Sequence, residues 1–225
     1  MTISFESGGK TIDLFGIENE GSPLVILNTY SKEGQRVYNE CTSLGTVPFT
    51  LAAISNLAWD DDMTPWAIPP LSKNDTPCLG KADEYLETLT SKIIPAILGK
   101  LSAKPSYIAI AGYSLGGLFA LYSSYKSELF SKVASASGSL WYPDFVDFAQ
   151  KNDFKRKPDC IYLSLGDKEA KTRNKILAPV QENTEKLADF YKNKEIPLTF
   201  EINKGNHFTE GEKRMAKGIK WILEN

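Results

Sequence analysis

The stretch from Ile108 to Tyr122, IAIAGYSLGGLFALY, constrains the fold more than any other part of this chain. An apolar run ends in a short segment rich in glycine, and apolar residues then resume with the spacing of a helix. The pattern predicts a buried strand, a tight turn and a helix. Gly112 and Gly116 lie two positions before and after Ser114, where small residues let the strand and the helix approach closely. The sequence therefore places Ser114 at the turn.

The same residues, Gly112-Tyr113-Ser114-Leu115-Gly116, fit G-x-S-x-G, the pattern of a turn that presents a nucleophilic serine. The bare pattern would arise by chance in about one chain in ten of this length. Its position between a predicted strand and a predicted helix favours a catalytic Ser114 over a serine that only caps the helix. The amino end of that helix would also stabilise negative charge developing near the serine.

Short apolar runs bounded by turn residues occur along the whole chain and are typical of strands that are covered on both faces. They are Pro23–Asn28, Phe49–Ile54, Tyr107–Ala111, Lys132–Ala136, Cys160–Leu165 and Leu198–Ile202. The opening residues, Ile3–Phe5 and Thr11–Phe15, are expected to add an antiparallel pair at one edge of the sheet.

Helical periods separate these runs. They extend from Ala82 to Ile93, from Leu115 to Tyr122, from Leu177 to Tyr191 and from Met215 to Ile222, and Thr209-x-x-Glu212 has the spacing of a capping box before the last helix. Strands that alternate with helices predict an α/β fold with a mostly parallel sheet and helices on both faces. The length of 225 residues suits one domain, residues 1–225, without a separate lid domain.

A serine hydroxyl is a poor nucleophile at neutral pH and needs a base that takes its proton. His207 is the only histidine of the chain, and it lies between the last predicted strand and the last predicted helix. A lone histidine is more often structural than catalytic. The serine motif upstream makes His207 the predicted base, because this is where such a fold places it.

The acid that orients the base should lie between the serine and the histidine in the sequence. Gly166-Asp167-Lys168-Glu169 follows the predicted strand Cys160–Leu165 and offers two carboxylates. We favour Glu169, which has the longer reach, over Asp167. A Ser-His pair without a carboxylate stays open, and the ordinary interpretation of both residues is a solvated turn.

Two backbone N–H groups are expected to form an oxyanion hole. The first belongs to Leu115, next to the predicted nucleophile, and the second would come from the turn that follows the strand Pro23–Asn28. Tyr30 is the candidate there, chosen by position alone.

One long connection, from Ser55 to Lys81, has no strand or helix period. It follows a predicted strand at the sheet edge where α/β proteins bind ligands. We expect Trp66, Trp141 and Tyr142, together with Trp59, to line an apolar substrate cleft, although such residues can equally fill the core. The aspartates at positions 60–62 would suit cationic or hydroxyl-rich substrates, but a solvated loop is the simpler interpretation.

Composition and charge exclude several classes of protein. The net charge is −2, and the one basic cluster, at residues 151–157, does not form a basic face, so nucleic-acid binding is not expected. No apolar segment is long enough to span a membrane and no signal sequence is visible, which predicts a cytoplasmic protein. The three cysteines have unrelated spacings and are expected to be reduced thiols without a metal.

The chain resembles the Putative esterase group of α/β-hydrolases, which includes enterochelin-esterase-like and esterase-D-like enzymes. The segments that carry the resemblance are LVILNTY, DDMTPW, GKADEYLETLTSKIIPAI, AGYSLGG, SASGSLWYPDF, YLSLGDKEAKTRN and GNHF. The resemblance implies that Ser114 is the nucleophile, His207 the general base and Glu169 the acid of the site. Two features depart from the group: Asn28-Thr29 replaces the usual His-Gly, and we expect no counterpart of the extra amino-terminal domain of the siderophore esterases.

The resemblance and the residues together predict a serine esterase that forms an acyl-enzyme on a small-molecule ester and uses no cofactor. The alternatives are an acyltransferase or thioesterase at the same site, or an α/β-hydrolase that binds a ligand without catalysis. The sequence leaves the oligomeric state open, with a homodimer as one candidate.

Overall fold

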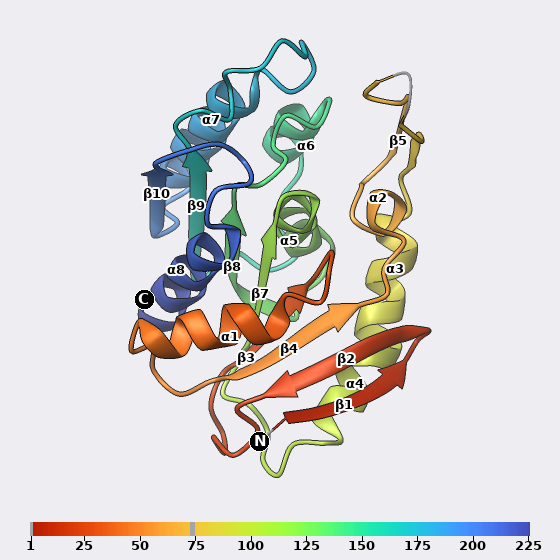
Figure 1. Cartoon of the computed structure of the whole chain (residues 1–225), viewed down its shortest axis with the longest axis vertical. Helices are drawn as coiled ribbons and strands as arrows, with labels where there is room; N and C mark the ends of the chain where they lie inside the picture. The colour runs from red at the N-terminus through yellow and green to blue at the C-terminus, as the bar shows by residue number, and fades with distance from the viewer. Residues whose placement is uncertain (1, 73–74) are drawn as a thin grey trace.

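The computed structural model describes residues 2–72 and 75–225, and an eight-stranded sheet runs through it in the order β1-β2-β4-β3-β7-β8-β9-β10 (Figure 1). The strands are β1 (Thr2–Ser7), β2 (Lys10–Phe15), β3 (Leu24–Asn28), β4 (Thr50–Ser55), β7 (Ile108–Tyr113), β8 (Phe130–Ala136), β9 (Cys160–Gly166) and β10 (Leu198–Asn203). The pairs β1–β2 and β2–β4 are antiparallel and all other neighbours are parallel, so the predicted parallel sheet with an antiparallel edge is confirmed.

Helices cover both faces of this sheet, as predicted (Figure 1). α1 (Gly34–Ser43) and α8 (Gly211–Glu224) pack on one face through residues such as Val37 and Ile219. The other face carries α3 (Ala82–Thr88), α4 (Ile94–Leu98), α5 (Leu115–Lys126), α6 (Phe145–Lys151) and α7 (Val180–Asn193). The central strands β3 and β4 are buried along their whole length, which explains why they have no alternating polar face.

The helical period that starts at Ala82 continues farther than the sequence pattern indicated. α3 passes into a π-helical turn, η1 (Leu89–Ile93), and then into α4. Pro95 lies in the first turn of α4 and has no N–H with which to continue the α-helical bonding of the preceding turn. The wider turn just before it lets the chain pass the proline without ending the helix.

The capping box predicted at the start of the last helix is wrong. α8 begins only after Glu210, whose φ is 52°. The Thr209 hydroxyl accepts a hydrogen bond from the Asn206 N–H at 3.1 Å instead of capping the helix. The Glu212 carboxylate is paired with Arg36 on α1 at 2.8 Å. Thr209 therefore shapes the turn between β10 and α8, and Glu212 joins α8 to α1.

The long connection between β4 and α3 contains only short elements: α2 (Trp59–Asp62), β5 (Ala67–Ile68) and β6 (Cys78–Leu79). Residues 73 and 74 of this connection lie outside the described residues. Within residues 2–72 and 75–225, no helix is both long and apolar enough to cross a bilayer.

The three cysteines are buried and free, as the sequence suggested. Burial raises the pKa of Cys41 to about 12 and that of Cys160 to about 11, so both thiols are protonated at neutral pH. The described part of the chain has no group of three or more His, Cys, Asp or Glu side chains that could hold a metal ion.

Candidate active site

Ser114 lies between β7 and α5 in a strained backbone conformation, with φ 59° and ψ −127°. A Cβ atom on Gly112 would lie 2.0 Å from the carbonyl oxygen of Gly116, so the strand and the helix cross with no room for a side chain. Ser114 precedes the helix, yet its hydroxyl makes no capping bond. The glycines thus hold a turn that leaves the Ser114 hydroxyl free to point away from the helix.

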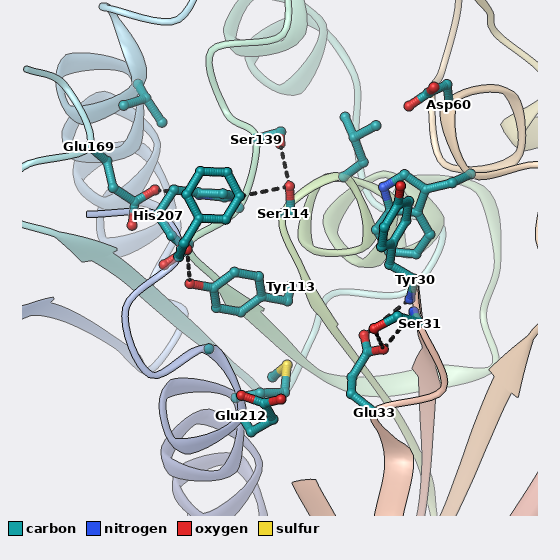
Figure 2. Close-up of a pocket in the computed structure, with 18 of the residues that line it drawn as sticks. Tyr30, Ser31, Glu33, Asp60, Tyr113, Ser114, Ser139, Glu169, His207 and Glu212 are labelled. Carbon is teal, nitrogen blue, oxygen red and sulfur yellow. Dashed lines mark hydrogen bonds and ion pairs between the residues drawn. The ribbon is translucent and has the colours of Figure 1, made fainter. Parts of the chain in front are cut away.

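The His207 imidazole contacts both of the other predicted residues. Its Nε2 atom lies 3.0 Å from Ser114 Oγ, and its Nδ1 atom lies 2.7 Å from Glu169 Oε2 (Figure 2). The backbone carbonyl of His207 accepts a hydrogen bond of 2.7 Å from the Tyr113 hydroxyl at the end of β7. The turn that carries the imidazole is therefore anchored to the strand that carries the serine.

The Glu169 side chain is only 4% exposed, and its carboxylate has several donors. Oε1 accepts from the Gly166 N–H at 2.7 Å and from the Arg214 guanidinium at 3.0 Å, while Oε2 faces His207. Burial alone would raise the pKa of Glu169, but the hydrogen bond and charge of His207 and the Gly166 N–H bring the pKa below its ordinary value of 4.5. Glu169 is therefore an anion at neutral pH.

The carboxylate of Asp167, the alternative acid, has a different partner from that of Glu169. It accepts a hydrogen bond of 2.7 Å from the Gly205 N–H, near the start of the turn that carries His207. The structure thus gives the two carboxylates different partners: Glu169 contacts the imidazole, and Asp167 contacts the backbone of the histidine turn.

The two predicted oxyanion donors differ in their surroundings. Leu115 is the first residue of α5, so its N–H has no acceptor within the helix. The Tyr30 N–H donates to Glu33 Oε1 at 3.0 Å, and the Ser31 N–H donates to Oε2 of the same carboxylate at 2.8 Å (Figure 2). An oxyanion that is to use Tyr30 has to replace the Glu33 carboxylate at this N–H.

A cavity of about 680 Å³ opens at these residues. Besides Ser114, His207 and Glu169, its walls include Tyr30, Glu33, Arg36, Trp59, Asp60, Leu71, Cys78, Ser139, Trp141, Leu177, Val180, Phe208, Glu212 and Met215. Trp59 lies directly beside the serine turn, because a Cβ atom on Gly116 would be 3.1 Å from its ring. Two of the predicted cleft residues, Trp59 and Trp141, thus border the cavity.

Trp66 and Tyr142, also predicted to line the cleft, are not among the residues that border the cavity. The Tyr142 hydroxyl donates to the Trp66 carbonyl at 2.5 Å, and Trp66 Nε1 donates to the Pro143 carbonyl at 3.1 Å. Tyr142 is 1% exposed. For these two side chains the structure agrees with the alternative interpretation, in which they fill the core behind the cleft.

The three consecutive aspartates have separate surroundings. Asp61 accepts from the Leu79 N–H, and Asp62 is paired with Lys10 at 2.6 Å. Asp60 borders the cavity, where partial burial followed by the charges of Asp61 and Asp75 raises the pKa of its carboxyl group. Only one member of the run therefore faces the site.

Sequence reasoning missed three residues of this site: Ser139, Glu33 and Arg214. Ser139 Oγ lies 3.4 Å from Ser114 Oγ, and the Ser139 N–H donates to the Ser114 carbonyl at 3.0 Å. Only Arg214 gave a usable signal, because it is a cation on a helix whose neighbouring residues Met215 and Gly218 are buried. Glu33 and Ser139 act through local loop geometry that no spacing reveals.

The geometry fits one chemical task. An imidazole that contacts a serine hydroxyl through one nitrogen and a buried carboxylate through the other can take the hydroxyl proton, while the carboxylate stabilises the resulting cation. The N–H of Leu115, the residue that follows Ser114 and begins α5, can stabilise negative charge that develops at this site.

Comparisons with known proteins agree with this fold. The family model described as Putative esterase matches residues 49–213. The uncharacterized protein YbbA from Bacillus subtilis (strain 168) is 27% identical over 170 residues, which cover 72% of this chain and 68% of that protein.

Two solved structures share the architecture over the whole chain. An IroE-like serine hydrolase from Shewanella oneidensis has a TM-score of 0.79 at 17% identity and covers 100% of this chain and 80% of its own. The enterobactin esterase FES from Shigella flexneri has a TM-score of 0.70 at 15% identity and covers 100% of this chain but 59% of its own. At these identities the two structures establish the α/β-hydrolase fold.

Proposed function

This chain belongs to the Putative esterase family, and from that premise we propose that it hydrolyses carboxylic esters of small molecules, with Ser114 as the nucleophile. The observation that carries the proposal is the continuous set of contacts from Ser114 Oγ to His207 Nε2 at 3.0 Å and from His207 Nδ1 to Glu169 Oε2 at 2.7 Å.

In the first half of the reaction, Ser114 Oγ attacks the ester carbonyl carbon while His207 Nε2 takes the hydroxyl proton. Glu169 accepts the hydrogen bond from Nδ1 and stabilises the imidazolium that forms. His207 then gives its proton to the leaving alcohol, and Ser114 carries the acyl group as an ester. No metal or organic cofactor takes part in these steps.

In the second half, a water molecule replaces the alcohol. His207 takes a proton from this water, the water oxygen attacks the acyl carbon, and the proton returns to Ser114 Oγ as the acid leaves. The N–H of Leu115 stabilises the negative oxygen in both halves. Tyr30 supplies the second N–H when the Glu33 carboxylate moves away from it.

Substrates enter the cavity that is bordered by the serine turn, by Trp59 and Asp60 on α2, and by Trp141 in the segment after β8. Its volume of about 680 Å³ suits a small-molecule ester. The names of the structural relatives include an enterobactin esterase, and we propose a small-molecule ester of the same general kind, without choosing the acyl or the alcohol group. We also propose that residues 1–225 form one hydrolase domain, since one sheet joins β1 to β10.

The test compares wild type with S114A on a panel of acetyl, butyryl and octanoyl nitrophenyl esters, feruloyl sugar esters and a catecholate ester of serine. We expect kcat to fall by about 10⁴-fold or more in S114A, because the nucleophile is lost. S124A is the matched control, since it removes a serine hydroxyl on α5 that donates to the Leu121 carbonyl and does not border the cavity. A fluorophosphonate probe should label wild type and S124A but not S114A.

The proposal is contradicted if S114A hydrolyses these esters at the wild-type rate. It is also contradicted if the probe labels S114A as readily as wild type, because the reactive serine would then lie elsewhere.

A further inference from the structure

Arg214 is an arginine in the protein interior, with only 2% of its side chain exposed. It lies in the first turn of α8. In the sequence it comes 45 residues after Glu169, the proposed catalytic acid, but the two side chains are in contact. A buried charge lowers stability strongly unless it is paired and fully hydrogen-bonded. What surrounds this guanidinium therefore decides what the residue does.

The guanidinium bonds to segments that follow or end four neighbouring strands. Nη1 donates to Glu169 Oε1 at 3.0 Å and to Ser137 Oγ at 3.1 Å, and it lies 3.5 Å from the Tyr113 hydroxyl. Nη2 donates to the Lys204 carbonyl at 3.0 Å. Arg214 thus joins the end of β7 and the turns after β8, β9 and β10 at one point.

The two oxygens of the Glu169 carboxylate have different partners. Arg214 and the Gly166 N–H both donate to Oε1, so that Oε2 is the oxygen presented to His207 Nδ1. The rigid, planar fork of a guanidinium fixes the plane of its acceptors better than a flexible ammonium does.

The same side chain acts on the base. The Lys204 carbonyl that accepts from Nη2 lies three residues before His207, in the turn that carries the imidazole. The Tyr113 hydroxyl beside Nη1 donates to the His207 carbonyl at 2.7 Å. The positions of the acid and of the base therefore depend on one buried cation.

We propose that Arg214 is a positioning residue of the hydrolytic site, which holds the Glu169 carboxylate and the His207 turn in the relative orientation that the Nδ1–Oε2 hydrogen bond requires. This inference rests on the proposed function. A residue that only stabilised the fold would fill the same space but would leave that hydrogen bond unchanged when replaced in a folded variant.

The experiment uses R214Q, R214K and the control R156Q, which replaces an arginine on the surface that is paired with Asp159. Each variant is first checked for folding by circular dichroism and thermal melting. Then kcat and KM are measured with the best ester of the panel. The Nδ1 proton of His207 is observed by NMR at low temperature, without substrate. His207 is the only histidine, so a low-field imidazole N–H signal has one assignment.

For folded R214Q we expect kcat to fall by about 100-fold with KM little changed, because a displaced catalytic group costs about this much. The low-field signal of the hydrogen bond to Glu169 should disappear. R214K should recover part of kcat, since an ammonium keeps the charge but cannot bond all acceptors in one plane. R156Q should match wild type in both measurements.

A folded R214Q with wild-type kcat and an intact low-field signal overturns the inference. If R214Q does not fold, R214K decides: wild-type kcat and an unchanged signal would overturn the positioning role, and a reduced kcat with a weakened signal would support it. The NMR signal needs no substrate. Failure of wild type to hydrolyse any ester would therefore count against the proposed function and not against the role of Arg214.

Discussion

The two walls of the cavity are built in different ways. The buried wall, which carries Glu169 and His207 as the proposed acid and base, rests on buried charges, with Glu169 4% and Arg214 2% exposed, and on the ends of neighbouring strands. The opposite wall, with Tyr30 and Trp59, consists of loops and short elements, and Tyr30 is 73% exposed. Changes in the buried wall are expected to disturb the proposed chemistry and the fold together. Changes in the opposite wall can alter the substrate while leaving both intact.

Among variants of the two walls, the largest loss of kcat is expected from E169Q in the buried wall. Glutamine keeps the shape but cannot stabilise an imidazolium, so kcat should fall by about 10³- to 10⁴-fold. The matched variant D167N changes the neighbouring carboxylate, which contacts the Gly205 N–H and not the imidazole. Steady-state kinetics with one ester should show at most a small loss in D167N. A larger loss in D167N than in E169Q would assign the acid to Asp167.

The stability of the buried wall should depend on pH through Glu169. The folded-state pKa of this carboxyl group is lowered from its ordinary value of 4.5, so its anion contributes stability that is fully present above the unfolded value. That contribution is lost as the pH falls through the lowered folded-state pKa. At pH 7, E169Q should lower the free energy of unfolding by about 3 to 5 kcal/mol, because it leaves the Arg214 charge unpaired.

Urea unfolding of wild type and E169Q at pH 7, 5, 4 and 3 checks this expectation. The difference between the two proteins should be constant down to about pH 5 and should then shrink. A difference that grows as the pH falls below 4 would contradict a lowered pKa of Glu169, because acidic groups common to both proteins cancel in the difference.

A smaller and more selective effect is expected from W141A, in the segment that follows β8. Trp141 borders the cavity and is half-buried, so its removal should change kcat/KM for esters with large acyl groups by about tenfold and leave acetyl esters little affected. W221A, on α8 and packed against Tyr162, is the control for loss of a tryptophan outside the cavity. Equal changes for all esters in W141A would place the tryptophan outside the substrate-binding wall.

The smallest effect is expected from E33A, which should increase kcat/KM instead of lowering it. Glu33 accepts the Tyr30 N–H that the oxyanion is proposed to use, so its removal should raise kcat/KM by about two- to tenfold, the value of one hydrogen bond. E33Q keeps an acceptor at the same place and should change the rate less. A loss of activity in E33A would mean that the carboxylate is needed to shape the loop.

The sequence predicted the buried wall better than the loop wall, and the reason is physical. Ser114, Glu169 and His207 follow strands whose ends are fixed by the sheet, so chain order and turn residues suffice to place them at one edge. The assignment of their catalytic roles stays a prediction until the variants are measured.

The loop wall depends on contacts that no periodic pattern encodes. The Glu33 carboxylate accepts hydrogen bonds from backbone N–H groups two and three residues before it. Behind the cavity, Trp66 Nε1 donates to the Pro143 carbonyl in a distant segment. The capping box failed for a similar reason, because Thr209 bonds to Asn206 within its own turn. In each case the side chain bonds to a partner that the sequence pattern does not indicate.

The backbone at Ser114 also sets a limit on how this protein can change over time. A side chain at φ 59° and ψ −127° costs stability that glycine would not lose, on the order of 1 kcal/mol. Selection for stability alone would favour replacement of this serine by glycine, which would remove the proposed nucleophile in one substitution. Selection for the proposed hydrolysis would instead keep a residue that the backbone conformation at this position disfavours.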